Sequence, residues 1–276
     1  MNETQEIVIA PGKSLGGYWR ELVGYRELFL FLVWRDVLVR YKQTVLGVAW
    51  SLLRPVMTML VFTIVFGRLA AFPSEGDSPY AILVFTALLP WQLFAGAVGD
   101  SSNSLIGNSS LIAKVYFPRL LIPVSAILVS LVDFCVALAL LGMLMLWYGF
   151  LPDWHLLALP AFLLLALLLA LSIGLWTAAL NVKYRDFRFI VPFALQLGLY
   201  LSPVGFSSGI VPERWRWLYS LNPMVPVIDG FRWSLLRGTT PFYLPGLVNA
   251  AALILLVGVS GLIYFRRTER RFADVI

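Results

Sequence analysis

The sequence has almost none of the residues on which disulfide-bonded proteins and metalloenzymes depend. It contains one cysteine, Cys135, and one histidine, His155. A single cysteine cannot form a disulfide within the chain, and a single histidine excludes a metal site built from several imidazoles. The sequence also has no GxxxxGK[ST] phosphate loop, no DxD pair and no evident nucleophile–base–acid set. We therefore expect no metal, no cofactor and no catalytic residues on this chain.

Charge is equally scarce. Only 13% of the residues are charged, 60% are hydrophobic and the mean hydropathy is +0.83, whereas soluble domains carry about 25% charged residues. This composition is typical of a polytopic membrane protein. The net charge of +6 could also indicate nucleic-acid binding. Because the cations are scattered between apolar segments, we expect no nucleic-acid partner.

The apolar segments predict an all-α integral membrane protein with six transmembrane helices. A helix needs roughly 20 apolar residues to cross the hydrocarbon core. Of the six segments that qualify, the fifth is the weakest, because Gln196, Pro203 and Gly205 interrupt it. The predicted spans are 46–67, 80–99, 121–148, 156–180, 189–206 and 243–265, which form a six-helix transmembrane domain over 46–276 behind an N-terminal segment, 1–45.

The basic residues predict the orientation of these spans. Fifteen of the lysines and arginines lie in the N-terminal segment, the 100–119 and 181–188 loops and the C-terminal tail, whereas the opposite loops hold four. Cations accumulate on cytoplasmic loops. We therefore expect both termini in the cytoplasm, and lipids of a bacterial inner membrane around the spans.

The longest outer loop, 207–242, is not hydrophilic. Prolines and glycines divide it into two apolar pieces, around 214–221 and 224–236. We interpret the pieces as two short helices that re-enter the outer leaflet, which is tolerated where they pack on protein. An amphipathic surface loop is the alternative. The aromatic residues suited to a membrane interface are Trp215, Trp217, Tyr219 and Trp233.

Charged residues interrupt two spans. Arg54 precedes Pro55 in the first span, where it could line a polar path for an anionic group or snorkel to the headgroups. Asp133 is the acid deepest within a span. It could relay protons or pair with Arg54, but we favour a structural contact between helices, since a lone acid makes a poor relay.

The segment before the first span, 25–43, predicts an interfacial helix. It is loosely amphipathic, and Asp36 is placed to pair with Arg40 at i,i+4. Arg35, Arg40 and Lys42 would lie at lipid phosphates, either as an orientation anchor or as a site that holds a diphosphate headgroup. The loop at 100–119 has the caps of a short helix, which could contact a soluble partner.

Four blocks, taken in order, resemble the permeases of type-2 ABC transporters that export polysaccharides, and most closely the lipopolysaccharide O-antigen exporters. The blocks cover most of the chain. They are YKQTVLGVAW with LLRPVMTMLVFTIVFG at 41–67, SLIGNSSLIAKVYFPRLLIP at 104–123, LNVKYRDFRFIVPF at 180–193, and VPERWRWLYSLNPMVPVIDGFRW at 211–233.

The resemblance implies a homodimeric channel with two copies of a separate nucleotide-binding subunit, which would hold ATP and Mg. It also implies that the 25–43 helix is a gate, that 207–242 closes the outer exit, and that 101–113 is a coupling helix that docks into the nucleotide-binding subunit. The coupling residues would be Asn103, Leu105, Ile106, Asn108, Leu111, Ile112 and Lys114.

The implied substrate is a polysaccharide on an undecaprenyl diphosphate anchor, with Arg35, Arg40, Lys42 and Arg54 where it loads. Trp50, Phe62 and Phe66 are candidates for the channel lining, although most aromatic residues of a membrane protein belong to its core or its lipid face. The alternatives are a capsule or teichoic-acid exporter of the same architecture, a membrane-embedded glycan enzyme, and a proton-coupled flippase. On the favoured interpretation the chain is a transport subunit rather than an enzyme.

Overall fold

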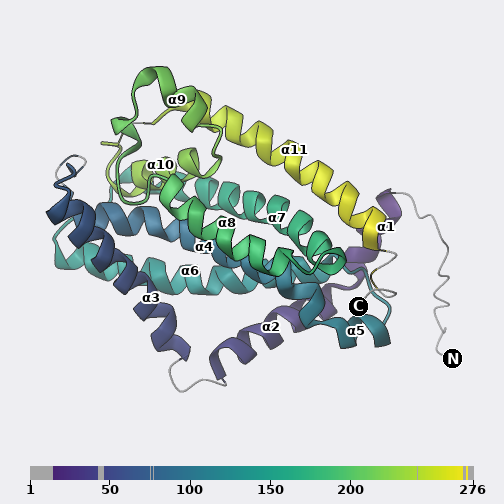
Figure 1. The fold of residues 1–276 in the computed structure, drawn as a ribbon. Coiled ribbons are helices and arrows are strands. Elements are labelled where there is room, and N and C mark those ends of the chain that lie inside the picture. The colour runs from purple at the N-terminus through teal and green to yellow at the C-terminus, as the bar shows by residue number, and fades with distance from the viewer. Residues whose placement is uncertain are drawn as a thin grey trace.

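The computed structural model of the chain describes residues 15–42, 47–74, 76, 78–240, 242–269 and 272. Every regular element within these residues is a helix (Figure 1). The predicted all-α class is therefore confirmed. The apolar runs are too long for strands, and a helix satisfies every backbone hydrogen bond inside its own segment, as a bilayer requires.

Five helical stretches are long and apolar enough to cross a membrane, judged by length and composition. They agree with five of the predicted spans. The protein is thus a multi-pass integral membrane protein. The five are α3 (Gly47–Phe62) with the π-helix η1 (Thr63–Leu69), α4 (Tyr80–Gly107), α6 (Leu121–Trp147), η2 (Trp154–Ala158) with α7 (Leu159–Lys183), and α11 (Leu244–Glu269).

The fifth predicted span, 189–206, is only partly helical, and it is not among the helices long enough to cross a membrane. Helix α8 covers Phe187–Leu201, which is 15 residues and about 22 Å at 1.5 Å per residue. Ser202 has extended backbone angles, as expected of a residue before a proline. Pro203 then ends the helix, and residues 202–205 turn inward and are buried.

Helix α4 lies at the centre of the bundle and packs against α3, α6, α7, α8 and α10. The predicted span 80–99 lies within this helix, which continues to Gly107. The polar residues beyond 99 stay helical because their side chains bond to the preceding turn: Asn103 Nδ2 donates to the Gly99 carbonyl at 3.0 Å and Ser104 Oγ to the Ser101 carbonyl at 2.7 Å. The short helix α5 (Ser109–Lys114) follows.

The shorter helices gather at the two ends of the bundle (Figure 1). One end carries η3 (Ser208–Ile210), α9 (Glu213–Tyr219) and α10 (Met224–Leu235), which confirms two helices in the long loop. The opposite end carries α5 with α1 (Leu15–Gly24) and α2 (Arg26–Lys42). Tyr18 donates to the Glu269 carboxylate at 3.3 Å. The start of α1 and the end of α11 therefore share this end.

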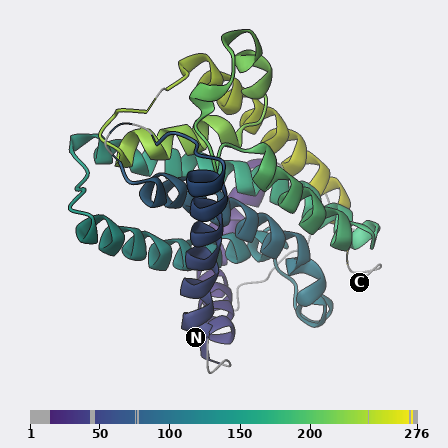
Figure 2. The same cartoon turned by 60° about the vertical axis from the view of Figure 1, so that its left-hand side comes forward.

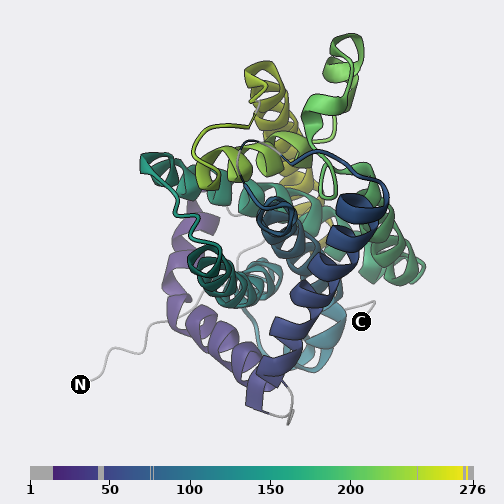
Figure 3. The same cartoon turned by 90° about the vertical axis from the view of Figure 1, so that its left-hand side faces the viewer.

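Helix α3 crosses the bundle steeply, in front of α6 and α7 as seen in Figure 2. It passes through Pro55 without a break in its assignment. The view along the bundle in Figure 3 shows that the end of α2 comes close to the start of α3. Helix α2 packs chiefly on α6 and also contacts α3. A helix is therefore present where the interfacial helix was predicted, and it lies against the bundle.

Candidate functional site

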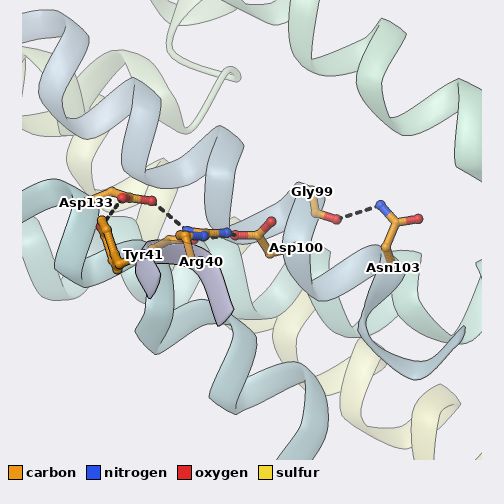
Figure 4. Close-up of polar contacts among 7 residues, drawn as sticks. Arg40, Tyr41, Gly99, Asp100, Asn103 and Asp133 are labelled. Atoms are coloured by element: carbon orange, nitrogen blue, oxygen red, sulfur yellow. Dashed lines mark hydrogen bonds and ion pairs between the residues drawn. The ribbon is translucent and has the colours of Figure 1, made fainter. Parts of the chain in front are cut away.

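The last turn of α2 brings a cation to two carboxylates on two different spanning helices (Figure 4). Arg40 Nη1 lies 2.6 Å from Asp133 Oδ2 on α6, and Arg40 Nη2 lies 2.5 Å from Asp100 Oδ2 on α4. The three side chains are each about one-third exposed. One guanidinium can bind both carboxylates because its Nη1 and Nη2 groups donate in different directions.

Two hydroxyl groups complete this arrangement, which we call the Arg40 cluster (Arg40, Tyr41, Asp100, Ser130 and Asp133). Tyr41 donates its hydroxyl to Asp133, and Ser130 donates to Asp100 Oδ2 at 3.0 Å. Burial and the hydrogen bond to Asp133 raise the pKa of Tyr41, so the phenol stays a protonated donor. With one guanidinium and two carboxylates that only accept, the cluster has a net charge of about −1.

Two predicted pairings are wrong in the light of this geometry. Asp36 does not pair with Arg40 but with its neighbour Arg35, at 2.7 Å. Asp133 binds Arg40 and Tyr41, not Arg54. The preferred interpretation of Asp133 as a contact between helices is confirmed. Because a charge at the edge of an apolar bundle needs a partner, Arg40 is held by the carboxylates that the tertiary fold offers.

A second contact joins α2 to the end of α4. Arg35 Nη2 donates to Asn108 Oδ1 at 2.6 Å, and Asn108 Nδ2 donates in turn to the Ser104 carbonyl at 2.9 Å. Asn108 is the single residue between α4 and α5. Arg35 and Arg40 therefore both reach α4, at its junction with α5 and about two turns earlier.

The other two cations of the predicted loading site lie apart from the Arg40 cluster. Lys42 and Arg54 are exposed, and neither pairs with an acidic residue among those the structure describes. In α3 the Arg54 carbonyl accepts a hydrogen bond from Thr58 Oγ1 at 2.9 Å. Of the four cations, these two have charge available for an anionic ligand.

The predicted coupling residues divide into a buried and an exposed set. Leu105 and Ile112 belong to a cluster of buried residues with Phe117, so they hold the segment in place. Ile106 is 42% exposed. Asn103 and Lys114 are exposed, and Asn108 and Leu111 are half-buried.

Two of the three aromatic candidates for a channel lining, Phe62 and Phe66, lie side by side. The Trp50 side chain lies outside the described residues. Phe62 is buried and Phe66 half-buried, with ring centroids 5.3 Å apart. Both rings pack on Gly205, where an added Cβ would lie 2.9 Å from each. Their role as a lining stays a prediction.

The aromatic residues of the long loop occupy different surroundings. Trp215 and Trp217 are exposed, and Trp233 packs edge-on against His155 at 4.5 Å. Trp215 and Tyr219 face a cavity of about 670 Å³ that opens between α4, α7, α8 and α9. Its walls are almost entirely apolar, with Trp91, Phe94 and Leu195 among them.

The sequence does not indicate the structural importance of two charged residues, Asp100 and Arg232. Asp100 falls at the predicted edge of a span, and only the continuation of α4 places it beside Arg40. Arg232 reads as a loop cation, yet it is completely buried in α10. It donates to the carbonyls of Phe206 at 2.8 Å and Val204 at 3.1 Å. The apolar residues on both sides of Arg232 are the one sequence signal of its burial.

Comparison with known proteins agrees with this architecture. The profile of the ABC-2 type transporter family matches residues 27–236. The chain is 32% identical over 259 residues to the O-antigen export system permease protein RfbA of Myxococcus xanthus, covering 93% of this chain and 98% of the relative. It is 26% identical to RfbA of Klebsiella pneumoniae over 254 residues, or 91% and 95% of the two chains.

A more distant similarity covers less of the chain. The inner membrane transport permease YadH of Escherichia coli K12 is 28% identical over 203 residues, which is 67% of this chain and 75% of that protein. The family match spans α2 to α10 and includes the Arg40 cluster. This multi-pass membrane protein belongs to the ABC-2 type transporter family, with O-antigen export permeases among its relatives.

Proposed function

We propose that this chain is the membrane-spanning permease of an ATP-driven exporter that moves a polysaccharide on an undecaprenyl diphosphate anchor from the cytoplasm to the periplasm. The observation that carries the proposal is the alignment with an O-antigen export permease over 98% of that protein's length. It is supported by the helical bundle and by the absence of a phosphate loop from the sequence. ATP is then hydrolysed on a nucleotide-binding partner.

The assembly we propose is a homodimer with two copies of this partner, in a bacterial inner membrane. The end of the bundle that carries α1, α2 and α5 faces the cytoplasm, consistent with the distribution of basic residues. The sixth crossing is made by α8 together with the turn at 202–206. Helices α9 and α10 then lie at the periplasmic exit as the re-entrant pair.

The loading site is narrower than the sequence predicts. A diphosphate needs unpaired cations, and the Arg40 cluster has a net negative charge that repels an anion. We therefore assign diphosphate binding to Lys42 and Arg54, and assign Arg40 to the positioning of α2. The partner docks on the exposed residues of the α4 end and α5, including Ile106 and Lys114.

The test is reconstitution of the chain in proteoliposomes, with and without a co-expressed nucleotide-binding subunit. We expect ATP hydrolysis and movement of a lipid-linked glycan only when both chains are present. Glycan modification or transport by this chain alone would contradict the proposal, and would favour an enzyme or a proton-coupled flippase.

A further inference from the structure

The end of α4 is fastened to α2 at two points by side chains alone. Asp100 holds Arg40 at 2.5 Å, and Asn108 holds Arg35 at 2.6 Å. The two helices run in opposite directions here, so the earlier residue of α2 meets the later residue of α4. Two contacts about two turns apart on α4 prevent α2 from sliding or swinging relative to that end.

The fastening also reaches a helix that does not continue into α5. Asp133 on α6 takes the second arm of the Arg40 guanidinium and the Tyr41 hydroxyl. The packing of α2 on α6 places this contact. Arg40 therefore joins α2 to two helices: to α4, close to the partner-facing segment (the end of α4 together with α5), and to the middle of α6, whose first residue, Leu121, follows that segment in the chain.

The energetics allow such a junction to hold without being permanent. Ion pairs of side chains that are one-third exposed are screened by solvent, and each contributes little alone. Charge-assisted and shared hydrogen bonds are stronger than isolated neutral ones. The single contact of Arg40 with Asp133 on α6 is therefore weak enough to be pulled apart by a partner that hydrolyses ATP, whereas the two contacts with the end of α4 act together.

We propose that Asp100 and Asn108 are positioning residues that carry the movement of the α4–α5 end to α2 by way of Arg40 and Arg35. Helix α2 would then move with the partner-facing segment as one body, and Asp133 would return it to its resting place on α6. The inference rests on the proposed function for the identity of the partner. It concerns contacts between helices, so it can be tested without export.

The experiment uses the full chain in complex with its nucleotide-binding subunit, with Cys135 replaced by Ser. Spin labels are placed at Val39 on α2 and Ser110 on α5, which are both exposed. In the otherwise unchanged chain we expect one narrow distribution of label distances that stays the same when ATP is added. The double variant Asp100→Asn with Asn108→Ala should give a broad distribution that changes with ATP.

Two further variants separate the link from a general loss of folding. The exchange Arg40→Asp with Asp100→Arg, made in a chain with Asp133→Asn so that the new carboxylate of α2 does not face a second one, restores opposite charges between α2 and α4 and should narrow the distribution again. Glu27→Gln removes an exposed charge of α2 and should change nothing. An unchanged distribution in the Asp100→Asn and Asn108→Ala variant would overturn the proposal, as would an exchange variant that folds but stays broad.

Export gives the second readout. The Asp100→Asn and Asn108→Ala variant should hydrolyse ATP at a similar rate while it exports about tenfold less glycan per ATP. An unchanged ratio of export to hydrolysis in this variant would overturn the proposal. If the unsubstituted complex itself exports no glycan, the proposed function fails, and the label distances still decide whether α2 is fastened to α4.

Discussion

At the scale of single residues, Arg232 shows how backbone carbonyls can hold a buried cation. Its guanidinium donates to carbonyls at Leu83, Val204 and Phe206. Backbone carbonyls that lose such donors stay desolvated, at a cost of about 1–3 kcal/mol each. The residue is therefore a structural clamp on the turn that follows α8.

We predict that Arg232→Met lowers the free energy of unfolding in detergent micelles by about 3 kcal/mol, because it strands these carbonyls. The matched control is Arg214→Met, since Arg214 is exposed on α9 and its guanidinium lies over the Trp215 ring. This control should change stability by less than about 0.5 kcal/mol. Equal losses in the two variants would contradict the assignment of Arg232 as a clamp.

Gly205 is a second residue that matters for stability, because aromatic side chains pack closely around it. Its carbonyl accepts a hydrogen bond from Tyr80, and its Cα faces the rings of Phe62 and Phe66. We expect Gly205→Ala to destabilise the protein by about 1–3 kcal/mol through overpacking, as measured by thermal unfolding. Gly142→Ala, where an added Cβ meets nothing within 4 Å, should be neutral or stabilising, and destabilisation there would argue against a packing effect.

At the scale of helices, the end of α4 and the short helix α5 that follows it each carry an isoleucine, and the two differ in exposure. Ile112 is 6% exposed and Ile106 is 42% exposed. We predict that Ile112→Ala costs about 2–4 kcal/mol of stability, whereas Ile106→Ala leaves stability nearly unchanged. Ile106→Ala should instead reduce copurification of the nucleotide-binding subunit about tenfold, equivalent to about 1.4 kcal/mol of binding.

Affinity purification measures how much of the nucleotide-binding subunit copurifies with each variant, and a fluorescence melting curve measures the stability of each variant. Loss of the partner in Ile112→Ala alone, with Ile106→Ala unaffected, would mean that docking depends on the shape of the segment and not on its exposed face.

The helices themselves could largely be predicted from the sequence, but their ends could not. Long apolar runs made α4, α6, α7 and α11 evident, because a bilayer leaves such a run no alternative to a helix. The helices end at Gly107 and Leu201, whereas the predicted spans end at 99 and 206. Serine and asparagine signal a loop in sequence, yet Asn103 and Ser104 bond to their own helix, while the apolar turn at 202–205 reads as helix.

The partners of charged residues were harder to predict for a physical reason. The i,i+4 rule describes an isolated helix and assigned Asp36 to Arg40, but Arg40 lies beside acids that are 60 and 93 residues away in the chain. Such contacts depend on the packing of α2 against α6, which no local pattern encodes. The four cations could be selected from the sequence as candidates. Only the structure shows that Arg35 and Arg40 are bonded to other helices, whereas Lys42 and Arg54 are exposed.

At the scale of the whole molecule, the number of membrane crossings depends on α8. A helix of 15 residues is shorter than the roughly 30 Å hydrocarbon core, so the turn at 202–206 must complete the crossing. We predict that single cysteines at Arg185→Cys and Glu213→Cys, in a chain with Cys135→Ser, react with an impermeant reagent from opposite sides of the membrane.

Inside-out and right-side-out vesicles provide the measurement, with Ser110→Cys as the reference for the face of α5. We expect Arg185→Cys to share the side of Ser110→Cys, which should be cytoplasmic. Labelling of positions 185 and 213 from one side would mean that α8 does not cross, and that the chain has an odd number of spans.

The burial of Arg232 also bears on the order in which the protein can be completed during synthesis. The carbonyls of Leu83, Val204 and Phe206 leave the ribosome before residue 232 exists. Until α10 is made, the turn that follows α8 lacks a donor that it has in the finished protein, and unsatisfied backbone groups are costly in a bilayer. We therefore expect a nascent chain that stops before Met224 to be degraded faster than the full chain, because nothing yet holds the carbonyls of Val204 and Phe206.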